Sequence, residues 1–502
     1  MELDFSSQSH FLIALLPEII LSLWGMLILV VGVWKKEGEE GPSAGDLGLL
    51  SLVGLVLAAG ANGWLYGVTQ TGGDGMVLVD RFRLFANWIF LLAGALSILI
   101  SLSYVTRQRL QAAETYGLML FAVVGMMIMG GTQNLIIIFL GLEIMSIGIY
   151  ALAAMNRRDR KSAEAGLKYF LLGAFSTGFF LYGIALTYGA TGSTNIAVIS
   201  RAILEGATVG PLLLFGIALL AIGFGFKVAA VPFHMWTPDV YEGAPAPITA
   251  FMATGVKAAA FVAFLRVFLV AFDGMYETWY PILWWLAAIT MVVANLIALV
   301  QSNVKRMLAY SSIAHGGYLL VALVAANEVA SSAMLFYLLV YTLMNIGAFG
   351  IVISVAHQGE DRLQVEDYAG FGWQQPMLAV FLSVFLLSLA GFPGTGGFMA
   401  KIFLLQGAVE SDLWTLAIVL VMATLFSYWY YLRVVWFMWM KDAVSPEAHT
   451  SVVASLPMRV ALVTAVALIL YLGVFPGALL GIVEGSVDSV TQVGGYLASL
   501  VP

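Results

Sequence analysis

The residues best suited to chemistry in this sequence are charged side chains inside long apolar runs. Lys227, Lys257 and Lys401 each lie well inside such a run, and Glu143 is a carboxylate at similar depth in the segment FLGLEIMSIGIY. Even on the gentler scales, a charge near the centre of a bilayer costs about 2.5–3.5 kcal/mol, so each needs a reason. Buried titratable groups at membrane depth are the material of proton relays. The pattern therefore predicts an ion pathway.

A structural interpretation competes with this one. Glu143 paired with one lysine would form an interhelical salt bridge, but such a bridge accounts for only one of the three lysines. The proton is favoured over sodium because a sodium site needs a cage of oxygen atoms, whereas a desolvated lysine gives up its proton more readily. An ion pair between Glu143 and Lys227 would favour the charged lysine, so its opening and closing would act as the switch.

Two histidines extend the prediction, since imidazole exchanges protons near neutral pH. His234 follows Lys227 by seven residues, about two turns along the same helix face, and His315 lies in AYSSIAHGGYLL among serine and tyrosine residues. Either histidine is also compatible with a simple hydrogen-bonding anchor. Lys168 follows Glu164 by four residues, which suits a local ion pair and a pathway entrance equally.

The remaining charges in the apolar runs have a simpler explanation. Arg266 and Arg433 lie within about two turns of a predicted helix end, where a long side chain can reach the headgroups. For these two residues we expect snorkelling rather than a functional role.

The composition indicates what kind of structure must hold these residues in place. Of 502 residues, 61% are hydrophobic and 10% are charged, against roughly a quarter charged in soluble domains. The 29 acidic and 22 basic residues also argue against a nucleic-acid partner. The sequence therefore predicts an all-α integral membrane protein with the lipid bilayer as its surroundings. About 14 apolar runs are long enough to span it: 11–34, 47–66, 84–104, 116–129, 135–155, 167–187, 212–240, 248–272, 282–300, 307–326, 333–355, 377–409, 413–440 and 460–475.

Loop charges predict the orientation. With fourteen spans, most basic loop residues fall on one side, including the cluster at 157–161, and only Arg81, Arg83 and Arg201 fall on the other. The positive-inside rule then places the 157–161 cluster in the cytoplasm and both termini on the outer, periplasmic side.

Two of the runs are interrupted near their lysine. Pro232 follows Lys227 by five residues, and Pro393 with four glycines lies just before Lys401. Proline breaks a helix by removing a hydrogen bond, and two matching breaks are the mark of inverted repeats with a site in each half. We therefore predict two inverted five-helix repeats, 111–272 and 273–442, preceded by three helices in 1–110 and followed by a last helix with a short tail in 443–502.

Three segments together resemble a known family: KVAAVPFHMWTPDVYEGAPAPITAF (227–251), QSNVKRMLAYSSIAHGGYLL (301–320) and SLAGFPGTGGFMAKIFLL (388–405). They are similar to the antiporter-like membrane subunits of complex I, the proton-pumping NADH:quinone oxidoreductase. Within that family, they resemble the branch called subunit N, which includes mitochondrial subunit 2, more than the M and L branches. The likeness covers nearly the whole chain.

The resemblance implies roles for the buried residues. Glu143 and Lys227 would form the ion pair of the first half-channel, and Lys257 would receive the proton at the centre. His315 would lead toward Lys401, from which the proton leaves.

The resemblance also implies that other subunits carry the redox chemistry. NADH, flavin, iron–sulfur clusters and quinone would be bound by other membrane and peripheral subunits of complex I, and this chain would hold no cofactor. The absence of cysteine agrees, since it removes thiolate ligands for such clusters. No His, Asp or Glu cluster has the spacing of metal ligands either. Neighbouring antiporter-like subunits would be among the partners, and the location would be a bacterial cell membrane.

Three alternatives stay open. One is a subunit of a multi-subunit sodium/proton antiporter or of a membrane-bound hydrogenase, which share this ancestry. Another is a scaffold in which the buried charges only fix packing. The third is a free-standing solute carrier, which would need a cavity lined by a substrate-shaped set of polar groups.

Overall fold

The computed structural model describes residues 2–4, 8–34, 41–71, 75–205, 210–356, 362–443 and 454–499. Helices make up nearly all of this structure, apart from a two-stranded parallel sheet of β1 (Glu2–Asp4) and β2 (Thr69–Thr71). The helices in the first half are α1 (Gln8–Ala14), α2 (Leu16–Val33), α3 (Ala44–Leu65), α4 (Arg81–Arg107), α5 (Ala112–Gly130), α6 (Leu135–Ala153), α7 (Arg160–Thr191), α8 (Ile196–Leu204), α9 (Pro211–Lys227), α10 (Thr237–Gly243), α11 (Ala246–Phe251), η1 (Met252–Val256), α12 (Lys257–Arg266) and η2 (Val267–Ala271).

The second half continues in the same manner. Its helices are η3 (Asp273–Met275), α13 (Tyr276–Leu299), α14 (Val304–Ala325), α15 (Glu328–Val355), η4 (Val365–Tyr368), α16 (Phe371–Gln374), α17 (Pro376–Ala390), α18 (Gly396–Glu410), α19 (Trp414–Met440), α20 (Leu456–Val474) and α21 (Gly477–Ser499).

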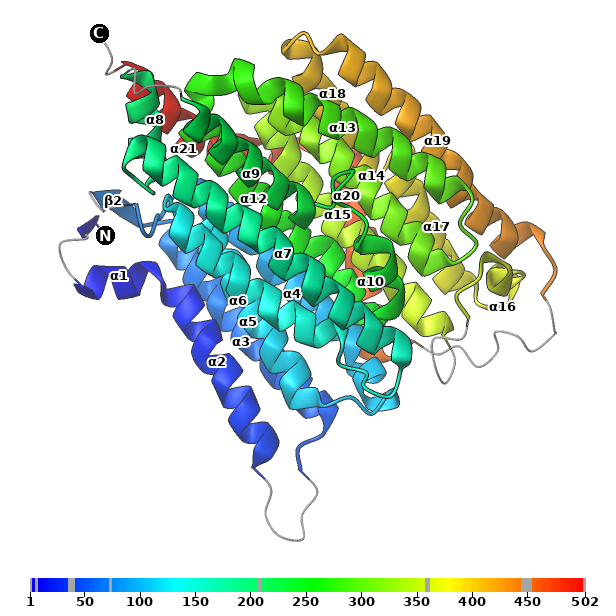
Figure 1. Ribbon diagram of the computed structural model, residues 1–502. Helices are drawn as coiled ribbons and strands as arrows, with labels where there is room; N and C mark the ends of the chain where they lie inside the picture. Colours follow the sequence, from blue (N-terminus) through cyan, green and yellow to red (C-terminus); the bar gives the residue numbers. More distant parts are fainter. Residues whose placement is uncertain are drawn as a thin grey trace.

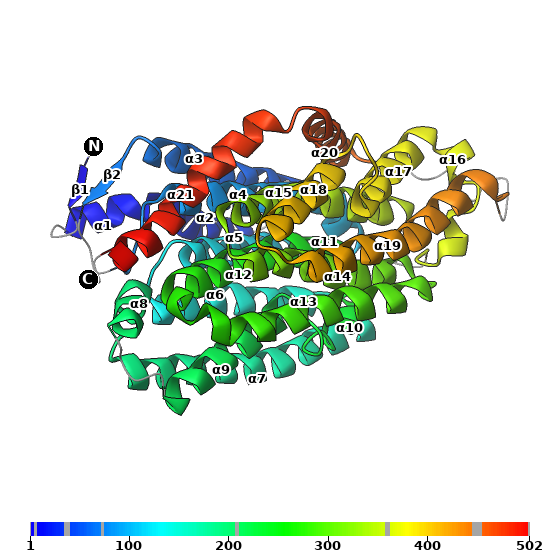
Figure 2. The same cartoon turned by 90° about the horizontal axis from the view of Figure 1, so that it is seen from above.

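The long helices run side by side as one bundle (Figure 1). Among the described residues, twelve helical segments are long and apolar enough to cross a membrane. Such helices satisfy their own backbone hydrogen bonds, which hydrocarbon cannot do for them. In both views, β1 and the carboxyl end of α21 lie at the same end of the bundle (Figures 1 and 2). The all-α membrane architecture predicted from the sequence is confirmed.

Burial separates central helices from peripheral ones. The most apolar window of α14 is 100% buried, and those of α11–α12 and α15 are 94% and 89% buried, whereas that of α2 is 28% buried. A helix with no exposed face in a membrane protein is surrounded by other helices rather than by lipid. These three segments therefore form the interior of the bundle.

Polar side chains mark where the helices begin. Asn134 caps α6 and Asn303 caps α14, each by accepting a hydrogen bond from a backbone N–H of the first turn. Each asparagine also forms an isolated antiparallel bridge, Asn134 with Asn195 and Asn303 with Gln364. The second bridge repeats the first at a constant offset along the chain, as expected if two halves share one plan. The repeat boundaries themselves stay a prediction.

Both predicted helix interruptions are present. The run 212–240 contains α9, then a segment of turns, then α10, and the run 377–409 contains α17, a short connection and α18. Because α9, α17 and α18 are each shorter than a full span, they are not among the twelve. The count of fourteen stays a prediction, since it depends on whether each interrupted run crosses the membrane once.

The end of the chain differs from the expected short tail. Residues 477–499 form the helix α21, which packs against α4, α8 and α15. Its glycines and scattered polar residues hid it from a search for apolar runs, which detects spans rather than helices lying against other helices.

Candidate functional site

Lys227 is the last residue of α9, at the first helix break. Its side chain is 3% exposed, and Nζ donates hydrogen bonds to Ser146 Oγ (2.7 Å) and Tyr150 Oη (3.3 Å) of α6. The ammonium also lies 5.4 Å from the ring centre of Tyr150 and 5.7 Å from that of Tyr169. Its partners are thus neutral hydroxyl groups and aromatic faces, which stabilise a cation without neutralising it.

At the break beside Lys227, an indole N–H donates a hydrogen bond to the end of α9. Trp236 Nε1 donates to the carbonyl of Phe226 at 3.1 Å, so this carbonyl at the end of α9 keeps a donor. A freed carbonyl survives at membrane depth only with such a partner or with water.

The expected direct ion pair between Glu143 and Lys227 is not formed. Glu143 is half-buried, and its Oε1 is buried without a hydrogen-bond partner. Ser146, which binds Lys227, lies three residues after Glu143 on α6, nearly one turn along the same face. The hydroxyl of Ser146 therefore takes the place next to the ammonium that we had expected the carboxylate to hold. Residue types and spacing gave no means of choosing between two acceptors one turn apart.

Lys257 opens α12, directly after the π-helical turn η1. It is 2% exposed, and its Nζ donates to the carbonyl and to Oγ (2.6 Å) of Ser312 on α14. A Cβ atom at Gly316 would lie 2.9 Å from the carbonyl oxygen of Val228 and 3.7 Å from Nζ of Lys257. Glycine at this position therefore lets α14 approach both the first break and Lys257.

His315 lies one turn beyond Ser312 on α14, in a shell of tyrosines. Its imidazole is 1% exposed. Nδ1 pairs with Tyr337 Oη at 2.6 Å and Nε2 with Tyr431 Oη at 3.2 Å, and the hydroxyl of Tyr431 also contacts Ser311. Both ring nitrogens thus face hydroxyl groups, which can either donate or accept a hydrogen bond.

Lys401 lies on α18 and reaches back across the second break. It is 4% exposed, and Nζ donates to the carbonyls of Leu389 (3.0 Å) and Ala390 (2.9 Å) at the end of α17. The same Nζ lies 5.0 Å from the ring centre of Tyr318, whose ring centre is 5.3 Å from that of His315. Ser312, His315 and Tyr318 thus follow one another along α14, between Lys257 of α12 and Lys401 of α18.

Lys168 lies apart from this line, in a network of charges at one end of the bundle. It is 40% exposed and pairs with Glu164 (2.6 Å), as expected, and with Asp239 of α10 (2.8 Å). Arg306 joins Asp239 to Glu242, each at 2.9 Å, and Lys161 binds Glu242 at 3.2 Å.

Two carboxyl groups of this network lie on α10, outside the twelve spans. Burial acts to raise the pKa of Asp239, but hydrogen bonds from Lys168 and Arg306 outweigh it and hold the pKa below its ordinary value. Burial also acts to raise the pKa of Glu242, but hydrogen bonds from Arg306 and Lys161 outweigh it, so this pKa is lowered as well. Both groups are therefore carboxylates at neutral pH.

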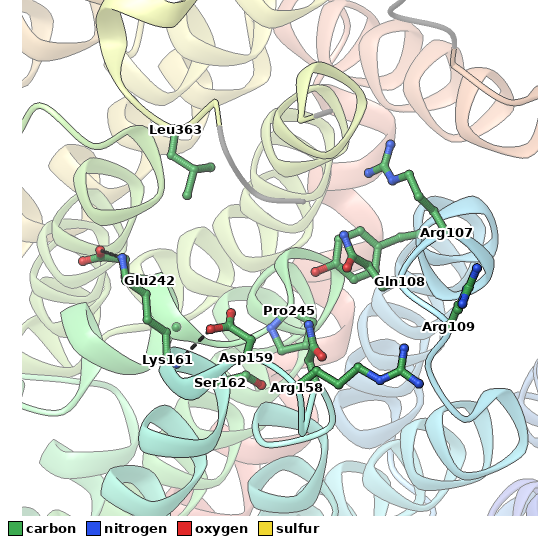
Figure 3. Close-up of a pocket in the computed structure, with 13 residues that line it drawn as sticks. Arg107, Gln108, Arg109, Arg158, Asp159, Lys161, Ser162, Glu242, Pro245 and Leu363 are labelled. Carbon is green, nitrogen blue, oxygen red and sulfur yellow. Dashed lines mark hydrogen bonds and ion pairs between the residues drawn. The ribbon is translucent and has the colours of Figure 1, made fainter. Parts of the chain in front are cut away.

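A polar cavity of about 540 Å³ lies beside this network (Figure 3). Figure 3 shows Arg107 and Arg109 on one side of the cavity and Lys161 with Glu242 on the other. A polar space of this size holds water. The charged end of α10 therefore lies against an aqueous space that leads to the bundle surface.

His234 does not share a helix face with Lys227. Because α9 ends at Lys227 and α10 begins only at Thr237, the two-turn argument for His234 was wrong. The imidazole is half-buried among turns, and its Nδ1 is buried without a hydrogen-bond partner. Its role in a pathway stays a prediction.

Two buried ion pairs escaped the sequence interpretation. Arg266 is 1% exposed and binds Asp80 at 2.6 Å instead of reaching the headgroups. Arg83, assigned to a loop, is fully buried and binds Glu18 at 2.6 Å. Glu18 lies inside the first apolar run, and an unexplained carboxylate there was the one available signal. By contrast, Arg433 donates to the carbonyls of Leu299 and Gln301, close to the end of α13.

Among the described residues, no group of three or more His, Cys, Asp or Glu side chains is placed to hold a metal ion. The site offers three buried lysine side chains, one imidazole and the hydroxyl groups between them, which are groups suited to carrying protons. An all-helical membrane bundle with a buried lysine at each of two helix breaks defines the class of antiporter-like membrane subunits.

Comparison with known proteins makes the assignment specific. The family described as NADH:quinone oxidoreductase/Mrp antiporter, TM, matches residues 132–427, and the chain belongs to this family. NADH-quinone oxidoreductase subunit N of Trichlorobacter lovleyi is 48% identical over 95% of this chain and 97% of its own length. A relative named subunit N 1 from Sorangium cellulosum is 43% identical over 94% of this chain and 97% of its own length. The resemblance to the subunit N branch is confirmed.

Solved structures agree. A chain of respiratory complex I from Thermus thermophilus is 34% identical, with a TM-score of 0.79, and the match covers 93% of this chain and 99% of that one. A chain of an archaeal membrane-bound sulfane sulfur reductase is 25% identical, with a TM-score of 0.83 and coverage of 97% and 99%. A chain of the Mrp complex from Dietzia shares the fold at 20% identity, with a TM-score of 0.81 and coverage of 98% and 99%.

Proposed function

We propose that this chain is the proton-translocating membrane subunit of an NADH:quinone oxidoreductase, with Lys227, Lys257, His315 and Lys401 as the groups that carry the proton. One observation supports this most strongly. From Ser312 to Tyr318, α14 places a hydroxyl, an imidazole and a phenol at successive turns between Lys257 and Lys401. Groups that can both donate and accept hydrogen bonds thus lie in succession between the centre of the bundle and the second break.

The first half requires a change of partner. Glu143 and Lys227 are not paired in this structure. Lys227 instead donates hydrogen bonds to the hydroxyl groups of Ser146 and Tyr150. In the proposal, the carboxylate and Ser146 are alternative partners of the ammonium, and exchange between them changes how firmly Lys227 holds its proton. Glu143 belongs to the pathway as the group that sets this switch.

The charged network at α10 would be the cytoplasmic entrance. Lys168 and Asp239 belong to the same ion-pair network as Glu242 and Lys161, and the last two residues line the aqueous cavity, so this network lies between water and the interior of the bundle. His234 lies between this network and Lys227 in the chain and is proposed as a further member. Under this orientation, both termini lie on the outer side of a bacterial cell membrane.

The redox chemistry belongs to partners in this proposal. Other subunits would bind NADH, flavin, iron–sulfur clusters and quinone, and this chain would hold no cofactor. Redox energy would reach the chain through neighbouring membrane subunits, as a shift between two charge arrangements of the buried groups. The residues 111–272 and 273–442 would form the two inverted repeats, each with one break.

Lysine-to-arginine replacement gives a sharp test. Arginine keeps the positive charge that a structural role needs but does not release a proton at ordinary pH. We expect Lys227→Arg, Lys257→Arg and Lys401→Arg complexes in vesicles to move fewer protons per NADH oxidised, while Lys441→Arg, at the exposed end of α19, behaves as the parent. Parent-level pumping in the three arginine variants, with pumping lost when the same lysines are replaced by alanine, would favour the scaffold interpretation.

The antiporter alternative needs a different measurement. Its basis is the shared fold of the Dietzia Mrp chain. If the tagged chain were purified from gently solubilised membranes without NADH:quinone reductase activity, the oxidoreductase assignment would be overturned.

A further inference from the structure

A second cavity lies at the opposite end of α4 from Arg107. It measures about 690 Å³, within the range of about 300–1,000 Å³ typical of small-molecule pockets, and lies between the end of α3, the start of α4, α15 and α21. Its walls are mostly apolar: Phe85, Trp88, Leu339, Leu479 and Ile482. Trp88 and Ile482 are 38% and 55% exposed, so the cavity is open to the surroundings of the bundle.

One cation, Arg81, stands at the end of this cavity. Arg81, the first residue of α4, makes no hydrogen bond or ion pair with any residue that the structure describes, and its side chain is exposed. Its neighbours in the chain are engaged, because Asp80 binds Arg266 and Arg83 binds Glu18. No acidic residue is among the described residues that line the cavity. The guanidinium therefore offers its donors to a ligand from outside the chain.

Aromatic residues place the cavity at a membrane surface. Tyr66 ends α3 beside Arg81, and Trp88 lies about 10 Å further along α4 at 1.5 Å per residue. Tyr66, Arg81 and Trp88 all line the cavity, so the three groups are close. Tyr and Trp collect at the level of the headgroups. The cavity thus runs from headgroup level at Arg81 into the apolar zone.

Two glycines of α21 leave room along one wall. A Cβ atom at Gly481 would meet nothing within 4 Å, and one at Gly485 would approach only Arg81 Nη1, at 3.8 Å. These glycines, one helical turn apart, present a flat face to the cavity. Because no side chain projects at these two successive turns of α21, this part of the wall leaves room for a hydrocarbon chain.

We propose that this cavity binds an anionic glycerophospholipid, with its phosphate on Arg81 and one acyl chain against the apolar walls. Charge complementarity selects this occupant: a guanidinium that is unpaired within the described part of the chain, at the water end of the cavity, matches a phosphodiester without a neighbouring ammonium. A soluble phosphate would leave the apolar walls unfilled. The lipid would join α21 to α3 and α4 at this surface.

Lipid competition tests the proposal on the intact complex. The purified complex is equilibrated with detergent micelles holding equal amounts of phosphatidylglycerol and phosphatidylethanolamine, washed, and its retained lipids are quantified by mass spectrometry. One basic residue near a membrane surface changes anionic lipid binding by about fivefold. We expect Arg81→Gln to weaken phosphatidylglycerol retention by about that factor and Gly481→Leu, which fills the cavity, to lower the retention of both lipids.

Arg201→Gln is the matched control, because Arg201 is another exposed basic residue at the same end of the bundle, on α8. It should retain both lipids as the parent does. Unchanged phosphatidylglycerol in Arg81→Gln, with lipid lost in Gly481→Leu, would overturn the selection for an anionic headgroup. Loss in Arg81→Gln with none in Gly481→Leu would overturn the acyl site, and no change in either variant would overturn the proposal as a whole.

Discussion

At the scale of single residues, hydroxyl groups matter as much as the charges. Lys227, Lys257 and His315 all bind serine or tyrosine hydroxyls rather than carboxylates. A hydroxyl accepts a hydrogen bond from a charged donor and donates one to a neutral acceptor, so it serves both protonation states. A carboxylate would instead hold the charge in place.

Tyr431 tests this view, because its hydroxyl contacts both His315 and Ser311. Tyr431→Phe removes that hydroxyl and keeps the ring. We expect a several-fold loss in the rate of proton transfer, below the 10²–10⁴-fold of a lone catalytic group, since Tyr337 still holds the other imidazole nitrogen. The measurement is the initial rate of NADH-driven proton uptake in vesicles. Tyr368→Phe is the control, because its buried hydroxyl has no hydrogen-bond partner; equal losses in both variants would contradict the role of Tyr431.

The sequence identified the buried charges but not their partners. Lysines in apolar runs stand out by composition alone, so Lys227, Lys257 and Lys401 were found. Arg266 was misread because its partner Asp80 lies 186 residues away in a loop. No local pattern reports a contact of that separation. Glu143 and Lys227 are unpaired in this structure for a finer reason, because a serine one turn away competes for the same ammonium.

At the scale of elements, the breaks were the most predictable feature. Proline and glycine act locally on the backbone, so their effect is visible in the sequence without knowledge of the fold. The same argument explains the error at His234. Placing His234 on the same helix face as Lys227 assumed a continuous helix, although Pro232 between them predicts a break. The π-helical turns η1 and η2, on either side of α12, had no sequence signal that we detected.

Gly391 tests the geometry of the second break. Both Gly391 and Gly394 have positive φ, +87° and +84°, so alanine at either is strained by about 1–2 kcal/mol. Only at Gly391 would the added Cβ meet Lys401, 2.9 Å from its Cδ, whereas at Gly394 it meets nothing within 4 Å. We expect both alanine variants to lower the Tm of the purified complex similarly.

Proton movement should separate the two variants. Gly391→Ala should impair it by displacing Lys401, and Gly394→Ala should leave it close to the parent. If the two variants pumped equally well, the position of Lys401 over the end of α17 would not matter for transport.

At the scale of the whole molecule, the sequence predicts an orientation that the bundle alone does not reveal. The charges at 157–161 and Arg201 were assigned to opposite sides by the positive-inside rule. Because the chain contains no cysteine, a single introduced cysteine is the sole thiol of this subunit and reports its own side.

We expect a membrane-impermeant maleimide to label Arg201→Cys in right-side-out vesicles and Arg158→Cys only in inverted ones. Both positions are exposed, at the start of the α7 region and on α8. Isolation of the tagged subunit separates its label from that of partner subunits. Labelling of both positions from one side would mean that the span count between them is wrong.

The contact between Lys401 and the end of α17 has a mechanical meaning. Two backbone carbonyls of one half-helix accept hydrogen bonds from a side chain of the other half-helix, so the amine is also a clasp between them. A charged donor binds a carbonyl about twice as strongly as a neutral one. When the proton leaves Lys401, the clasp therefore loosens, and when a proton returns it tightens. The transported proton therefore helps to hold together the two halves of the broken helix that it passes.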